Sequence, residues 1–270
     1  MHRFLCALVF ASFLLFVRDA RADEIAPTLE PFDLREKASV ELKKIVGTLS
    51  AADKKKLTGI YAAFHPESGD PFALAACDDD GDYVVVLSDA MLRLASNVAR
   101  AQSQDDAAGT RTVEDYARFL AQTQVKGRRL LPPPPGTFTS DVTPVTYDDR
   151  LEEILSFVVA REVMHLVAGQ LVCAHPTATK EAGDTTWTAE EHRSALANVA
   201  TIYPGQPGHD EDAVAHVLAA GHMELGALAL LLFFEQYEAE PRVRFAPSYR
   251  ELYPRSVARR AAVKSAAEHE

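Results

Sequence analysis

The sequence predicts an α+β fold that is mostly helical and contains one small β-sheet. Apolar residues recur at the three- and four-residue spacing of amphipathic helices over most of the chain. Residues 83–87 are β-branched or apolar throughout, as expected for a short buried strand. Residues 147–171 form a long and heavily apolar helical pattern, so we expect this helix to lie at the centre of the fold.

The first 22 residues have the features of a cleavable export signal. A basic start precedes an apolar run from Phe4 to Val17, and Ala20-Arg21-Ala22 forms a small-x-small cleavage pattern. The run is too short to span a bilayer as a membrane anchor. We therefore expect residues 1–22 to be removed, leaving an exported, periplasmic or secreted protein with no stable membrane anchor and a single domain over residues 23–270.

The charge balance argues against some partners. The formal charge of −11 becomes −13 without residues 1–22, because that segment holds three arginines and one aspartate. A chain this acidic is not expected to bind nucleic acid or an anionic membrane surface.

Cys77 and Cys173 are the two cysteines that remain after the expected cleavage. Disulfides persist in exported proteins, so we predict that these two residues form one. The alternative is a pair of buried free thiols.

The N-terminal third is expected to contain helices, a turn and the strand. Helical spacing over residues 33–64, broken near residues 47–50, predicts two helices. The acidic residues 78–82 lack the alternating ligands and closing glutamate of an EF-hand calcium loop, so we interpret them as a solvated hairpin turn. Ser88 can cap a helix over residues 89–102.

The rest of the chain is predicted to be helical with polar connections. Residues 103–112 are polar and expected to form a flexible loop, and the Pro-rich stretch 131–144 cannot continue a helix. Besides the central helix, we expect helices over residues 113–124, 189–199, 211–220, 223–238 and 254–268, with a break near Gly221.

The central helix carries the sequence Arg161-Glu162-Val163-Met164-His165. Zinc peptidases have His-Glu-x-x-His at such a place, because residues four apart offer two imidazoles to one ion while the glutamate polarises the bound water. Here Arg161 stands where the first histidine would be. Taken alone, Glu-x-x-His is common on helices, and an exposed glutamate beside a satisfied histidine is its ordinary interpretation.

Several further segments follow a recognisable order around this motif. Glu211-Asp212-Ala213-Val214-Ala215 is similar to a Glu-x-x-Ala-Asp motif. With the motif helix, these segments resemble the HtpX-like gluzincin family of zinc metallopeptidases over about residues 55–265. The matching segments are 71–74, 83–92 (the family's edge strand), 157–170, 211–215, 221–235 and 252–259.

The resemblance implies a zincin-like fold with a small sheet beside the central helix. It also implies a zinc ion held by His165 and Glu211, with Glu162 as the general base. Four positions of the family's site differ here: Arg161 and Gln170 each replace a histidine, Ala215 replaces an aspartate that supports the site, and Tyr253 replaces the histidine before a proline.

Electrostatics favours a cluster of ion pairs over a metal at these positions. His165 and Glu211 are fewer than the three protein ligands of a catalytic zinc site. At about 4 Å and an effective dielectric of 20, an arginine repels a divalent ion by roughly 8 kcal/mol and attracts a carboxylate by about half of that. We therefore expect the Arg161 guanidinium to substitute for zinc and to pair with Glu211 and Glu162.

Other histidines could in principle hold a relocated metal. Glu211 and His216 are five residues apart, which places them about 140° apart around a helix and makes a shared ion difficult. The simplest interpretation of His175, His192, His209, His216 and His222 is that they are surface or capping residues.

Two classes of function remain. The favoured one is a catalytically impaired or inactive metallopeptidase-like protein, a pseudoprotease that binds polypeptide or serves as a scaffold for envelope proteins. The alternative is an active, divergent zinc metalloendopeptidase of the cell envelope in which His165 and Glu211 hold zinc and Glu162 is the general base.

Overall fold

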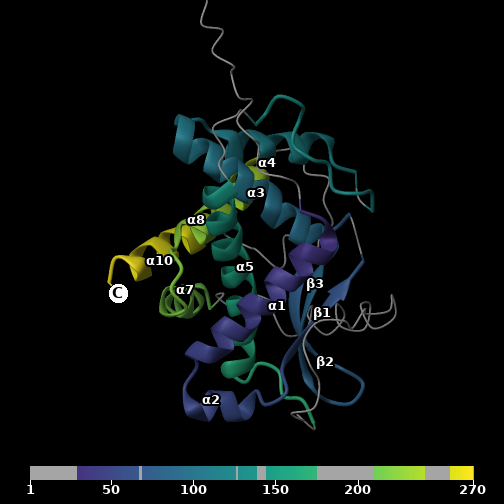
Figure 1. Cartoon of the computed structure of the whole chain (residues 1–270), viewed down its shortest axis with the longest axis vertical. Coiled ribbons are helices and arrows are strands. Elements are labelled where there is room, and N and C mark those ends of the chain that lie inside the picture. Colours follow the sequence, from purple (N-terminus) through teal and green to yellow (C-terminus); the bar gives the residue numbers. More distant parts are fainter. Residues whose placement is uncertain are drawn as a thin grey trace, which may run out of the picture.

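The computed structural model describes residues 29–66, 69–125, 127–138, 144–174, 209–240 and 256–269. Over these residues the fold is α+β and mostly helical, with one three-stranded sheet, as predicted (Figure 1). The elements in chain order are α1 (Pro31–Thr48), α2 (Ala51–Lys56), β1 (Tyr61–His65), β2 (Ala73–Cys77), β3 (Tyr83–Ser88), α3 (Asp89–Ala108), α4 (Thr112–Thr123), α5 (Pro144–Val167), α7 (Asp210–Ala219), α8 (Leu225–Ala239) and α10 (Ser256–Ala267).

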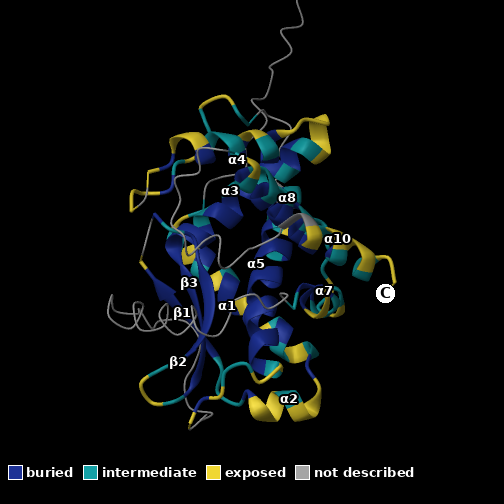
Figure 2. Ribbon diagram, turned by 180° about the vertical axis from the view of Figure 1, so that it is seen from behind, coloured by how far each residue is buried: buried dark blue, intermediate teal, exposed yellow. Residues whose placement is uncertain are grey.

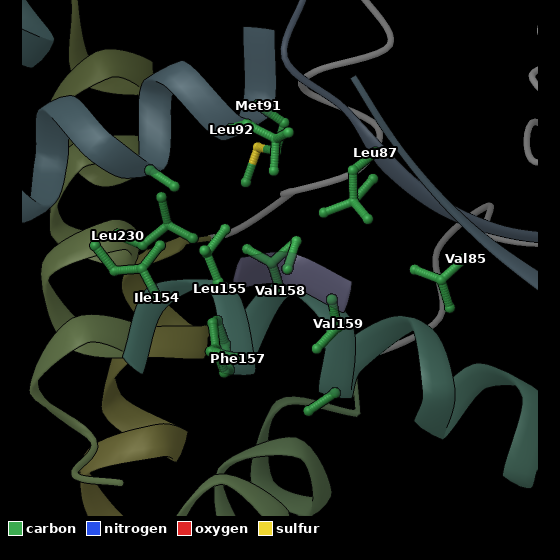
Figure 3. Close-up of a cluster of buried hydrophobic side chains, with 14 of the residues drawn as sticks. Val85, Leu87, Met91, Leu92, Ile154, Leu155, Phe157, Val158, Val159 and Leu230 are labelled. Carbon is green, nitrogen blue, oxygen red and sulfur yellow. The ribbon is translucent and has the colours of Figure 1, made fainter. Parts of the chain in front are cut away.

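Helix α5 is the centre of the molecule, as its apolar pattern predicted. It packs against α1, α3, α7, α8 and the sheet. The sheet lies on one side of α5, and α7, α8 and α10 lie on the other (Figures 1 and 2). Side chains from β3, α3, α5 and α8 meet in one apolar cluster (Figure 3), which removes a large apolar area from water and stabilises the fold.

The sheet has the strand order β1-β3-β2. β1 pairs with β3 in parallel, and β2 pairs with β3 antiparallel. β3 was expected to correspond to an edge strand, but it is the central strand. All six of its residues are buried, because it lies between β1 and β2 and packs against α3 and α5. The strand at the edge beside α5 is β2, which contacts that helix directly.

The acidic turn between β2 and β3 is a hairpin turn, as predicted. The Asp78 carboxylate accepts hydrogen bonds from the backbone N–H groups of Asp80 and Asp82 and from the Tyr61 hydroxyl. Gly81 adopts a positive φ of 85°, which a glycine tolerates without steric cost.

The second predicted helix, which was expected to continue to residue 64, ends earlier in the structure. The apolar spacing of residues 57–64 favoured a helix, but α2 ends at Lys56 and Tyr61–His65 forms strand β1. Gly59, with a φ of 83°, lies in the left-handed conformation that commonly terminates helices. Every residue of β1 is buried, so pairing with β3 outweighs the helical spacing.

Helix α3 is capped as predicted but is longer than expected. The Ser88 Oγ accepts a hydrogen bond from the Met91 N–H at 3.0 Å. Residues 103–108 were predicted to be loop and are the last turns of this helix, which Gly109 ends at a φ of 65°. Ser103 is buried and donates to the Ala99 carbonyl, so a polar sequence here does not mean an exposed segment.

The remaining described helices match their predictions within a few residues. α7 and α8 are separated at Gly221, whose φ is 90°, and α7 packs against α5. The part of the chain described here contains no helix long and apolar enough to cross a membrane. Residues 1–22, the predicted helix 189–199, His175, His192 and Tyr253 lie outside the described residues.

Candidate functional site

Three polar side chains interrupt the apolar surface of α5 on its way through the core. Arg161, Glu162 and His165 are only 3%, 1% and 2% exposed. Buried ionisable groups are costly unless they are paired or hydrogen-bonded, so the partners of these three residues decide what the site can do.

Arg161 is held by two carboxylates. Its Nε lies 3.0 Å from Asp210 Oδ1, and its Nη1 lies 3.5 Å from Glu162 Oε1. Asp210 also binds Arg259 of α10 through both carboxylate oxygens. One buried carboxylate at the start of α7 therefore joins the guanidinium groups of α5 and α10.

The charge state of Asp210 follows from these contacts. Burial alone would raise its pKa, but hydrogen bonding to Arg259 and the charges of Arg161 and Arg259 together lower it below its ordinary value. Asp210 is therefore ionised at neutral pH.

The predicted partners of Arg161 are corrected in one respect. The pair with Glu162 is present, but the acidic residue of α7 that reaches Arg161 is Asp210, and Glu211 is exposed. Neighbouring residues on a helix point about 100° apart, so only one of the two carboxylates can face α5. Sequence reasoning missed Asp210 because it gave the family motif precedence over the adjoining acidic residue.

Glu162 connects the central helix to the edge of the sheet. Its Oε2 accepts a hydrogen bond from the backbone N–H of Ala75, in the middle of β2, at 3.1 Å. That N–H is not used by the pairing of β2 with β3, so it lies on the outer edge of the strand. The carboxylate expected to act as a general base therefore fastens α5 to β2.

His165 begins a chain of side-chain hydrogen bonds. Its Nδ1 bonds the Gln170 Oε1, and the Gln170 Nε2 lies 3.1 Å from His209 Nε2. His209 Nδ1 is 3.3 Å from Asp212 Oδ2, and the His165 and His209 rings pack edge to face at 5.1 Å. Burial, together with the charge of Arg161, lowers the pKa of His165 to about 3, so the imidazole is neutral.

The other altered positions are less informative. Gln170, in place of a family histidine, takes part in the chain just described, and Ala215 is half-buried on α7. His209 and Arg259 join the site from outside the predicted set. The sequence could have indicated Arg259 as a site residue, because it lies in the segment 252–259 that resembles the family.

The residues of this site do not fit the zinc ion that the resemblance implies. A guanidinium paired with Asp210 adjoins His165, and Glu211 is exposed. Among the described residues, the one place where three metal-ligating side chains converge is formed by Glu41, Glu152 and His222, none of which belongs to this site. No catalytic step is therefore assigned to a metal here.

The predicted disulfide between Cys77 and Cys173 is confirmed. The sulfur atoms are 2.08 Å apart, the Cα atoms are 5.5 Å apart, and the two cysteines are 96 positions apart in sequence. The bond joins the end of β2 to the segment after α5. The disulfide therefore links β2 to the region of α5, as the hydrogen bond between Ala75 and Glu162 does.

Comparison with known proteins yields no relative. No protein-family model, no curated protein and no solved structure matches the chain.

Proposed function

We propose that this chain is an exported, non-hydrolytic protein with a zincin-like fold, in which buried ion pairs take the place of a catalytic zinc. Its role is that of a scaffold for envelope proteins. The observation that carries the proposal is the ion pair between Arg161 and Asp210, deep in the core and next to His165.

The charges around Arg161 support this proposal. Arginine stays protonated in proteins, so its positive charge is permanent. The side chains of Arg161 and Asp210 are only 4% and 3% exposed, so the guanidinium has almost no contact with water that could replace its carboxylate partner. A divalent ion beside it would meet repulsion and would compete for the same carboxylate.

The engagement of Glu162 supports the same proposal. A general base of a zinc peptidase must be free to take a proton from the attacking water. Glu162 instead accepts the Ala75 N–H and contacts Arg161. Both contacts engage the carboxylate that would have to receive that proton.

Between the two non-catalytic roles, the contact at Ala75 favours a scaffold. A polypeptide that paired with the outer edge of β2 would need the backbone N–H groups of that edge. The N–H in the middle of the strand already donates to Glu162.

Peptidase assays test the proposal, together with measurements of zinc content in variants that show which residues hold the ion. We expect the purified protein to leave unfolded protein substrates uncleaved, with or without added Zn²⁺, and Arg161→His to gain zinc that is lost again when His165→Gln is added. The opposing result is zinc in the native protein that disappears in His165→Gln, together with a cleavage activity that Glu162→Gln abolishes. Such a result would establish the active endopeptidase instead.

The pairing itself is tested by a matched pair of substitutions on α7. Asp210→Asn should lower the free energy of unfolding by about 3–5 kcal/mol, because it leaves two buried guanidinium groups without their shared carboxylate. Glu211→Gln changes the adjoining exposed residue and should stay within about 0.5 kcal/mol of the wild type. Urea unfolding measures both, and the opposite ranking would show that Glu211 is the buried partner.

A further inference from the structure

A second cluster of ionisable side chains lies outside the site on α5. Glu41 of α1, Glu152 of α5 and His222, in the turn between α7 and α8, place their nitrogen and carboxylate oxygen atoms within 4.8 Å of one another. Gly221 precedes the histidine at a φ of 90°, a backbone conformation that turns the chain sharply. Three elements far apart in sequence thus direct metal-ligand atoms to one point.

The contacts within this cluster are close. His222 Nε2 lies 2.7 Å from Glu41 Oε2, and Glu41 is only 1% exposed. The Lys44 ammonium lies 2.8 Å from Glu41 Oε1 and 3.5 Å from Glu152 Oε2. A positive charge therefore already sits between the two carboxylates.

Lys37 completes the cluster on its other side. Its ammonium lies 3.1 Å from Glu152 Oε1 and 3.3 Å from Asp148 Oδ1. With Glu41 and Lys44, the carboxylates outnumber the ammonium groups by one, so the cluster has room for additional positive charge.

We propose that Glu41, Glu152 and His222 form a binding site for a divalent transition-metal ion, of which Zn²⁺ is the best match, and that the ion displaces the Lys44 ammonium. One imidazole nitrogen and two carboxylate oxygens are ligands that Zn²⁺ accepts, and the fourth position remains for water. The three donor atoms already lie within 4.8 Å of one another. They need to move only modestly closer to form zinc–ligand bonds of about 2.0–2.2 Å.

The ability of Lys44 to leave distinguishes this cluster from the site on α5. The Lys44 side chain is 38% exposed, whereas that of Arg161 is 4% exposed. A lysine at the surface can swing its flexible stem into water and keep its ammonium hydrated. A metal can therefore replace Lys44 at low cost but cannot replace Arg161.

Metal binding at this point would join three parts of the fold. α1 packs against α5 and α7, and His222 lies directly after α7. An ion bound to the folded state alone stabilises that state by mass action. Zn²⁺ should therefore raise the melting temperature as its concentration increases.

The experiment is a calorimetric titration of Zn²⁺ into protein first freed of metal by a chelator, repeated with Co²⁺, whose visible spectrum reports the ligands. We expect one ion per chain, and at least tenfold weaker binding in His222→Gln and in Glu152→Gln. His222→Gln keeps an amide donor for Glu41, so it should fold. Lys44→Met removes the competing ammonium and should tighten binding.

Two control variants locate the ion. His216→Gln changes a histidine of α7 that contacts Thr48 Oγ1 at 2.7 Å, and it should bind as the wild type does. His165→Gln should also leave this binding unchanged, which separates the cluster from the site on α5. Absence of binding, equal affinity in His222→Gln, or loss of binding in His165→Gln would each overturn the proposal.

Discussion

The protonation of His165 is set by the groups that surround it. Gln170 accepts a hydrogen bond from the imidazole through Oε1, so the ring carries its proton on Nδ1. The Gln170 amide then donates to His209 Nε2, which leaves the His209 Nδ1 proton for Asp212. This chain fixes only the proton on Nδ1, whereas burial and the charge of Arg161 lower the pKa of His165 to about 3 and so keep Nε2 unprotonated.

This neutral histidine should make the protein less stable in weak acid. An imidazole with a pKa of 6.5 in the unfolded chain and about 3 in the fold takes up a proton on unfolding throughout that interval. The unfolded state binds more protons there, so stability falls as the pH falls, by roughly 1.4 kcal/mol per pH unit. His165 should contribute a slope of this size to urea unfolding measured between about pH 6 and pH 4.

His165→Gln isolates the contribution of this residue. His216 also has a lowered pKa, caused by burial, so the wild-type slope contains more than one histidine. Asp210 contributes stability that is lost as the pH falls from its ordinary pKa of 3.8 toward its lowered pKa in the fold, below this interval. The variant should therefore have a shallower slope, and parallel curves for the two proteins would show that His165 is protonated in the fold.

At the scale of elements, α5 and α8 cross at a point where only a glycine fits. A Cβ atom on Gly226 would lie 2.5 Å from Glu153 Cβ and 2.7 Å from the Ile154 backbone N. The Gly226 N–H also donates to Glu153 Oε2 at 2.8 Å, so a hydrogen bond joins the two helices at this crossing.

Gly226→Ala should therefore destabilise the protein by about 1–3 kcal/mol, because backbone atoms of α5 must move to admit one methyl group. Gly47→Ala is the matched control, since it makes the same change near the end of α1, where nothing lies within 4 Å of the new atom. Replacing a helical glycine with alanine there should be neutral or stabilise by about 0.5–1 kcal/mol. Equal thermal shifts for both variants would contradict this account of the crossing.

The elements predicted well from the sequence are helices in which apolar residues recur at regular helical spacing. α5, α7 and α8 were expected within a few residues, and so was the Ser88 cap. Strand β1 was missed because Leu57, Ile60 and Phe64 happen to keep helical spacing, and only pairing with β3 selects the strand. Asp210 was missed for a similar reason, since the phase of a short helix depends on what it packs against.

At the scale of the whole molecule, the edge of the sheet is fixed to the central helix at two points. Glu162 holds the middle of β2 through the Ala75 N–H, and the Cys77–Cys173 disulfide holds its end. Strand edges with free backbone groups invite pairing with other chains. These two connections restrain the outer edge of β2, and the disulfide forms only in an oxidising environment.

The disulfide is the larger of the two restraints because it closes a long loop. A bridge across 96 residues restricts the unfolded chain and should contribute about 4 kcal/mol. Cys77→Ala, Cys173→Ala and the double variant each remove the same bond, so urea unfolding should show nearly equal losses for all three, with steeper transitions because the unfolded chain is more expanded. Additive losses in the double variant would mean that the two side chains stabilise the fold by packing alone, and the edge of β2 would then be held by Glu162 without covalent help.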